Sequence, residues 1–171
     1  GKINDKDKVP LGRGALPNFF YAFNGGLKYK NFDMTVLFQG IADYWTIDMS
    51  MGRVEYPFEG VYTEWHKNAW TAERYANGEN ITYPALSAKK NSNHEASNFF
   101  LEDKSYLRLK NLEIGYTFDL FNGTRLYFSG QNLLTWDKLN HDVYGPEAHY
   151  AGGLEGIPVY RLYNVGLSIN F

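Results

Sequence analysis

The chain has 171 residues, of which 44% are hydrophobic and 21% are charged, a composition typical of a single ordered domain. Its net charge of -2, with no run of Lys or Arg, argues against nucleic-acid binding. The absence of cysteine excludes disulfides, thiolate zinc sites and cysteine nucleophiles. Aromatic residues make up 18% of the chain, which suits either membrane-interface girdles or a carbohydrate-stacking surface. Because the chain begins at Gly1 without a signal peptide, we expect a processed product or a piece of a longer protein.

The first 17 residues are polar and turn-rich. They resemble the second half of an Asp-rich calcium loop, in which Gly1 is the turn glycine, Lys2 offers its carbonyl and Asp7 supplies the late carboxylate. The first half of this motif is missing. We therefore expect a solvated polar loop and no cofactor, with Asp7 as a structural calcium ligand only if the missing half is supplied.

Two segments that follow alternate apolar and polar residues with a period of two, over residues 19–29 and 32–45. Such alternation predicts strands with one apolar and one polar face, joined here by the minimal connection Lys30-Asn31. Both segments are longer than the mean soluble strand of about 5 to 6 residues. A tilted membrane strand needs about 9 to 11 residues.

A long connection over residues 46–97 separates this hairpin from the next strand and holds Trp65 and Trp70. Its length is unusual for a simple loop, which indicates either a functional or a disordered segment. Helical spacing of Trp65, Ala69 and Trp70 predicts a short helix over residues 61–74.

Strand patterns return over residues 98–118, 124–136 and 158–171, with a second long loop over residues 137–157. In the first of these strands, Arg108 and Lys110 occupy positions where the apolar face should continue. Because a Lys or Arg facing lipid at the midplane costs about 2 to 4 kcal/mol, we expect this part to lie outside the lipid.

Short turns at residues 30–31 and 119–123 alternate with the long connections at 46–97 and 137–157. This asymmetry is typical of bacterial outer-membrane barrels, in which the long loops face outward. Bacterial barrels have even strand numbers from about 8 upward, so these roughly five strands cannot close a barrel alone. We therefore predict an all-β fold: the C-terminal antiparallel strands of a larger transmembrane β-barrel, not an independent domain.

Several segments together resemble the C-terminal end of the SusC/RagA family of TonB-dependent outer-membrane transporters of Bacteroidetes. They are YAFNGGLKYKNFDMTVLFQG (21–40), SYLRLKNLEIGYTF (105–118) and RLYFSGQNLLTW (125–136), with GKINDKDKVPLG (1–12) and the last strand (163–171) in agreement. The resemblance implies a Gram-negative outer-membrane barrel of about 22 strands with a plugged lumen. It also implies TonB-driven import of glycan or peptide oligomers with a SusD-like surface lipoprotein. The plug and the TonB-contacting segment are expected N-terminal to Gly1.

No catalytic constellation is evident, and we expect no enzymatic activity. The four histidines fall in the predicted outer loops without metal-ligand spacing, and no carboxylate pair can be placed on facing strands. Ligand contact is assigned instead to aromatic side chains of the loops that could stack on sugars or peptides: Trp65, Trp70, Tyr144 and Tyr150. The competing interpretation is that these rings pack the loops on each other or against the lipoprotein.

A different class of protein also fits the composition, namely a soluble aromatic-rich β-sandwich that binds carbohydrate. A glycan-degrading enzyme is the third alternative, and it requires two carboxylates about 5 to 10 Å apart in a cleft. A lipid-facing apolar band distinguishes the barrel from both.

Overall fold

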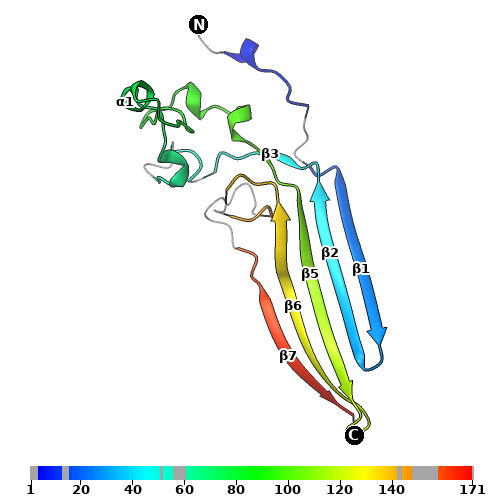
Figure 1. The fold of residues 1–171 in the computed structure, drawn as a ribbon. Helices are drawn as coiled ribbons and strands as arrows, with labels where there is room; N and C mark the ends of the chain where they lie inside the picture. Colours follow the sequence, from blue (N-terminus) through cyan, green and yellow to red (C-terminus); the bar gives the residue numbers. More distant parts are fainter. Residues whose placement is uncertain are drawn as a thin grey trace. The chain divides into compact units, whose positions relative to one another are not determined.

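The computed structural model describes residues 4–12, 16–50, 52–55, 61–141, 144–147 and 158–170. Contacts divide the chain into two units (Figure 1). The sheet unit comprises residues 14–45, 103–140 and 158–171, and the loop unit comprises residues 1–13, 46–102 and 141–157. Two of the three segments of the loop unit thus come mainly from the connections predicted to be long.

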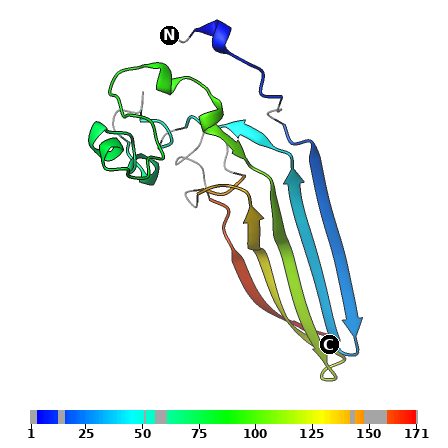
Figure 2. The same ribbon diagram turned by 45° about the horizontal axis from the view of Figure 1, so that its top comes forward.

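The sheet unit is one antiparallel sheet of five strands in the order β1-β2-β5-β6-β7, visible side by side in Figure 2. The strands are β1 (Phe19–Tyr29), β2 (Phe32–Ala42), β5 (Tyr106–Phe118), β6 (Thr124–Asp137) and β7 (Leu162–Ile169). Within this sheet, each strand pairs with the strand that comes before it and the strand that comes after it along the chain. The sheet is therefore a simple meander with β1 and β7 at its edges.

Apolar side chains form continuous rows across one face of this sheet. One row runs through all five strands because each residue pairs with the next: Leu27, Met34, Ile114, Phe128 and Val165. Directly opposed residues of antiparallel strands lie on the same face, so each row is shared by the whole sheet. A second row lies closer to the short turns: Tyr29, Phe32, Tyr116, Leu126 and Leu167. These side chains are largely exposed in the sheet unit.

A β-bulge at Lys110 changes which residues of β5 face the apolar side. Leu37 pairs with Asn111 and Phe38 with Leu109, so Lys110 is left over in the pairing with β2. One extra residue reverses the alternation along the strand. Arg108 therefore lies on the polar face, where its Nε donates to Thr135 Oγ1 at 2.9 Å. The expectation that Arg108 continues the apolar face is wrong for this reason.

Several predicted segments are shorter in the structure. β2 ends at Ala42, and Asp43 adopts a left-handed backbone with a φ of 52° before the short strand β3 (Trp45–Ile47). The strand expected over residues 98–118 is divided into a 3₁₀ turn (Asn98–Phe100), β4 (Leu101–Asp103) and β5. β3 and β4 pair with each other as a separate two-stranded sheet.

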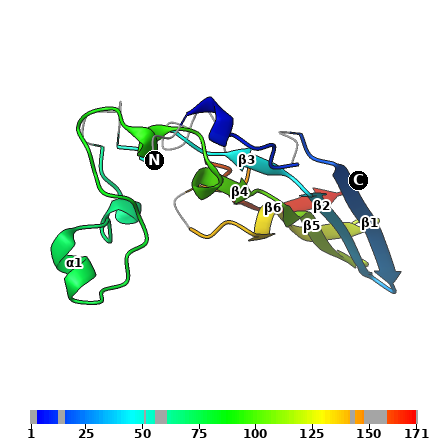
Figure 3. The same ribbon diagram turned by 90° about the horizontal axis from the view of Figure 1, so that it is seen from above.

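The loop unit is built mainly from irregular chain and short helical turns, as Figure 3 shows around α1. The predicted helix over residues 61–74 is a 3₁₀ turn (Glu64–His66) followed by the single-turn α1 (Ala72–Ala76). Thr71 begins α1 by accepting a hydrogen bond from Arg74 N at 3.1 Å, and Gly78 follows it with a φ of 68°. Two further 3₁₀ turns lie at Asp5–Asp7 and Ser92–His94. None of the helices in the described residues is long and apolar enough to cross a membrane.

The apolar core of the loop unit is small. It consists of the buried residues Val54, Ala69, Tyr83 and Phe100, with Ile47, Met49 and Trp65 packed against it. So few apolar side chains leave much of the loop unit to be organised by polar contacts.

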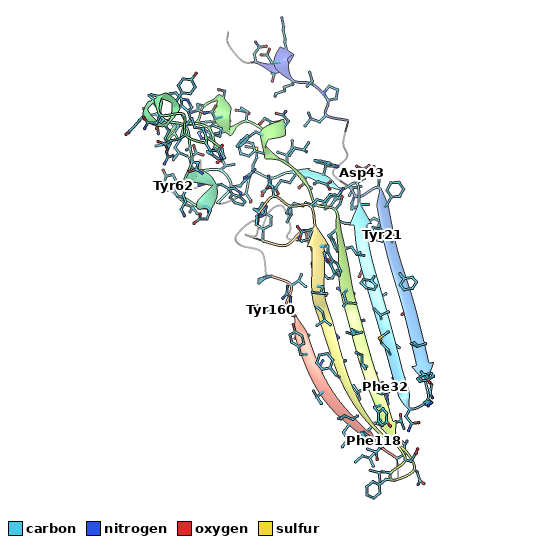
Figure 4. All side chains as sticks on the ribbon, viewed as in Figure 1. Tyr21, Phe32, Asp43, Tyr62, Phe118 and Tyr160 are labelled. Atoms are coloured by element: carbon cyan, nitrogen blue, oxygen red, sulfur yellow. The ribbon has the colours of Figure 1, made fainter. Side chains whose placement is uncertain are left out.

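Gly40 of β2 permits a close cross-strand contact at the end of the sheet away from the short turns. The Tyr21 ring lies over Gly40, and the Tyr21 hydroxyl donates to the Tyr106 carbonyl oxygen at 3.0 Å. Figure 4 shows Tyr21 at this end and Phe32 and Phe118 near the opposite end. A Cβ added to Gly40 would overlap both the ring and the carbonyl oxygen.

We expect Gly40→Ala to destabilise the folded protein by about 1 to 3 kcal/mol, because the tyrosine and the β5 backbone would have to move. Gly26→Ala is the matched control, since the nearest atom to its added Cβ is 3.6 Å away, an ordinary contact. Thermal unfolding of the two variants measures the difference. Equal midpoints would show that the Tyr21 contact does not constrain the sheet.

Candidate functional site

The interior of the loop unit holds a buried arginine between aromatic rings and a carboxylate. Arg53 is 5% exposed, and its guanidinium carbon lies 4.7 Å from the centre of the Trp65 ring, a cation–π contact. Its Nη2 lies 3.9 Å from Oε1 of Glu102. A buried charge requires such compensation, so Trp65 and Glu102 hold Arg53 in place.

Glu102 also connects the two loop segments of the chain. The Tyr144 hydroxyl donates to its Oε2 at 3.3 Å, and His141 Nε2 lies 3.3 Å from its Oε1. The Trp65 ring centre lies 4.8 Å from that of His141 and 6.2 Å from that of Tyr144. His141 and Tyr144 are thereby attached to Trp65 and Glu102, within the one loop unit.

Glu55 is a second buried carboxylate of the loop unit. It accepts hydrogen bonds from the Tyr83 hydroxyl at 3.1 Å, the Ser87 amide at 3.0 Å and His94 Nε2 at 2.9 Å. His94 Nδ1 accepts a hydrogen bond from the backbone N–H of Asn91, so the ring proton lies on Nε2. Burial raises the pKa of Glu55, but the bonds from His94 and the backbone outweigh it, and the pKa is lowered overall. Burial and the adjacent Glu55 raise the pKa of Tyr83, so this hydroxyl remains a donor.

The structure brings together two of the four aromatic residues assigned to ligand contact, Trp65 and Tyr144, through His141. Trp65 is half-buried against the core, whereas Trp70 is 43% exposed and lies outside this cluster. Tyr150 lies outside the described residues. The assignment of all four to ligand contact stays a prediction.

Sequence reasoning missed Arg53, Glu102 and His141 as the centre of the cluster. A buried charged residue in a long loop carries no periodic signal, because its burial depends on contacts distant in the sequence. Only the density of aromatic residues in the two loops pointed to this region.

Asp7, the predicted calcium ligand, has a local structural role. Its Oδ2 accepts a hydrogen bond from the backbone N–H of Asn4 at 2.7 Å. In turn, Asn4 Oδ1 accepts a hydrogen bond from the backbone N–H of Lys6 at 3.0 Å. The two side chains thus cap a 3₁₀ turn. Among the residues that the structure describes, no group of three or more His, Asp or Glu side chains is arranged to hold a metal ion.

Two carboxylates do lie near each other on the polar face of the sheet, contrary to the expectation that no such pair exists on facing strands. Arg125 of β6 donates from Nε to Asp33 of β2 at 3.0 Å and from Nη2 to Glu113 of β5 at 2.8 Å. Its guanidinium crosses Gly115, where a Cβ would obstruct it. Because one guanidinium hydrogen-bonds both carboxylates, neither is free to act as a general acid, and the group is a brace across three strands.

Comparison with known proteins places the chain in a class. No family model matches it. The whole chain aligns with TonB-dependent receptor P3 of Formosa agariphila at 31% identity, and with TonB-dependent receptor P26 of the same organism at 28%. The chain belongs to the TonB-dependent receptors. It spans 18% of the length of each of these relatives, so it is a small part of a large protein.

Solved structures agree with this assignment in fold. The RagAB peptide importer in its closed-closed state matches 97% of the chain with a TM-score of 0.74 at 23% identity, over 18% of the importer chain. Its open-open state matches 99% of the chain, and 19% of the importer chain, with a TM-score of 0.72 at 23% identity. The prediction of a TonB-dependent receptor is confirmed. The likeness in fold also confirms the predicted antiparallel sheet from part of a larger barrel.

His66 makes the stability of the loop unit depend on pH. Burial lowers the pKa of His66 below its ordinary value of 6.5, so the folded loop favours the neutral ring. We expect the contribution of His66 to be complete above pH 6.5 and to be lost as pH falls toward its lowered folded value. Glu55 acts in the same direction, but only below its ordinary pKa of 4.5.

Hydrogen exchange of residues 61–102 in the full-length receptor, corrected for intrinsic rates, should show lower protection at pH 5.5 than at pH 7.5. His66→Asn is the matched variant, because its amide oxygen can still accept from the Thr63 amide while the side chain does not titrate. Protection in that variant should be nearly independent of pH over this interval. An equal loss of protection in both proteins would assign the effect to another group.

Proposed function

We propose that this chain forms part of the barrel wall and the outer loops of an outer-membrane nutrient transporter, and that it acts without enzymatic chemistry. The observation that carries the proposal is the apolar face that continues across all five strands. Alternate residues on the other face include Asn24, Gln39, Ser129 and Asn164, as a wet lumen requires. The TonB-dependent relatives support the same role.

The alternative of a soluble carbohydrate-binding sandwich requires a second sheet packed over one face. In the described part of the sheet unit there is one sheet, and Phe23, Leu27, Val165 and Leu167 are each more than half exposed. A water-soluble protein rarely leaves so large a contiguous apolar surface uncovered. Lipid is the environment that this face fits.

The proposal extends to the complete receptor. Its cargo would be a peptide or oligosaccharide, captured between the loop unit and a SusD-like surface lipoprotein, and import would be driven by TonB through a plug outside this chain. The RagAB peptide importer and the TonB-dependent receptors of Formosa agariphila support this assignment. The exposed aromatic side chains of the loop unit suit stacking on either kind of cargo: Tyr62, Trp70 and Tyr75.

Neighbouring residues of β7 test the membrane orientation of the sheet. Val165, which is 75% exposed, lies on the apolar face, and Asn164 lies on the polar face. We expect Val165→Arg to cost about 2 to 4 kcal/mol in the membrane and to reduce the folded receptor in the outer membrane. Asn164→Arg, its matched control, should assemble nearly normally. The heat-modifiable folded band in outer-membrane fractions measures both, and equal assembly would contradict the proposed lipid face.

Substitution of two tryptophans distinguishes a role in ligand contact from a role in holding the loops together. Trp70→Ala should lower uptake of the cargo by about tenfold, corresponding to about 1.4 kcal/mol of lost stacking, while receptor abundance and loop protection stay unchanged. Trp65→Ala should instead reduce hydrogen-exchange protection of residues 61–102, because Trp65 covers Arg53. Uptake of labelled peptide and oligosaccharide mixtures by cells provides the measurement. Normal uptake by Trp70→Ala would remove Trp70 from the ligand site.

A further inference from the structure

The short turn between β5 and β6 presents two apolar side chains beyond the last strand pair. Leu120 is 58% exposed and Phe121 is 71% exposed. The turn is well defined, because the Leu120 carbonyl oxygen accepts from the Gly123 amide at 2.9 Å and from the Thr124 hydroxyl at 3.0 Å. The Asn170 side chain donates to the Gly123 carbonyl oxygen at 3.1 Å and ties the turn to the end of β7. Leu120 and Phe121 are therefore held at the rim of the sheet.

Turn chemistry alone does not explain the choice of Phe121. Its φ is 48°, in the left-handed region that suits glycine or asparagine and is unfavourable for a bulky side chain. Asn122, with a φ of 57°, follows the usual preference. The other short turn at this end of the sheet has Lys30 in the same conformation, with a φ of 51°. The two turns share a backbone geometry at this position and differ in the side chain that they present.

The turn adjoins a group of aromatic rings on the apolar face. The ring centres of Phe32 and Tyr116 lie 4.9 Å apart, and those of Tyr116 and Phe118 lie 4.8 Å apart. Figure 4 shows Phe32 and Phe118 at the turn end of the sheet. Leu120 and Phe121 follow Phe118 within three residues, so these exposed apolar residues continue the chain directly from this aromatic group.

We propose that Leu120 and Phe121 insert into the phospholipid headgroup layer and anchor this rim of the barrel wall. The proposal rests on the proposed membrane function, since it requires the adjoining face to be in lipid. Continuity with that face selects phospholipid as the partner. Aromatic side chains are enriched at membrane interfaces, where burial of the ring is favourable. We expect the ammonium group of Lys30 in the other turn, whose Nζ lies 5.5 Å from the centre of the Tyr29 ring, to stay in water.

Spin labels test this placement in the full-length receptor reconstituted in phosphatidylethanolamine/phosphatidylglycerol nanodiscs. This chain has no cysteine, so single cysteines at Phe121→Cys, Leu120→Cys, Lys30→Cys and Val165→Cys can carry a nitroxide. Collision with oxygen reports lipid, and collision with a polar nickel chelate reports water. Lys30→Cys is matched to Phe121→Cys, because both residues have a left-handed backbone at the same end of the sheet.

We expect the ratio of oxygen to nickel collisions to exceed one at Phe121 and Leu120 and to fall below one at Lys30. A ratio below one at Phe121 and Leu120 would overturn the anchor. Low collision rates with both reagents would also overturn it, since they would show that another protein segment covers the turn. A ratio above one at Lys30 would show that the whole rim is immersed, and would contradict a specific anchor. Val165→Cys is independent of the turn: a water-like ratio there would refute the proposed membrane function itself.

Discussion

The structure depends on a constraint of strand pairing: opposed residues of antiparallel strands share a face, and successive residues do not. A slip of one residue in any pair would move a whole strand of apolar side chains to the polar face. The row from Leu27 to Val165 persists because four successive pairings keep their register. The same pairing brings Asp33, Glu113 and Arg125 together on the polar face, where they connect three strands. Apolar rows and ionic brace are thus two consequences of one register.

The dependence of the faces on strand pairing explains which features of the strands could be predicted from the sequence. Alternation of apolar and polar residues is local, so the pattern over residues 19–29 or 112–118 can be recognised without knowledge of the neighbouring strands. The bulge at Lys110 is different, because an extra residue is defined only by comparison with β2 and β6. Reading β5 with an uninterrupted period of two put Arg108 on the apolar face. Its pairing with Gln39 and Thr135 places it among polar side chains instead.

The structure of the loop unit, in contrast, depends mainly on contacts between residues that are far apart in the sequence. Aromatic content identified Trp65 and Tyr144 as residues of interest, and they lie in one cluster, yet neither their proximity nor the role of Arg53 could be derived from spacing. Glu102 and Tyr144 are far apart in the sequence and meet only because the second loop packs on the first. The helix predicted from the spacing of Trp65, Ala69 and Trp70 is interrupted. Thr63 and Thr71 begin two separate turns.

Buried ion pairs add little net stability, because desolvation offsets much of their attraction, but loss of one partner is costly. In a loop unit with a small apolar core, we therefore infer that Arg53 and Glu102 act chiefly by excluding other arrangements of the chain. Exposed rings such as Trp70 and Tyr75 take no part in these pairs. The side chains that define the shape of the loops are thus different from those available to a ligand. A receptor built in this way can change its exposed aromatic contacts without disturbing the buried charges that hold the loops in place.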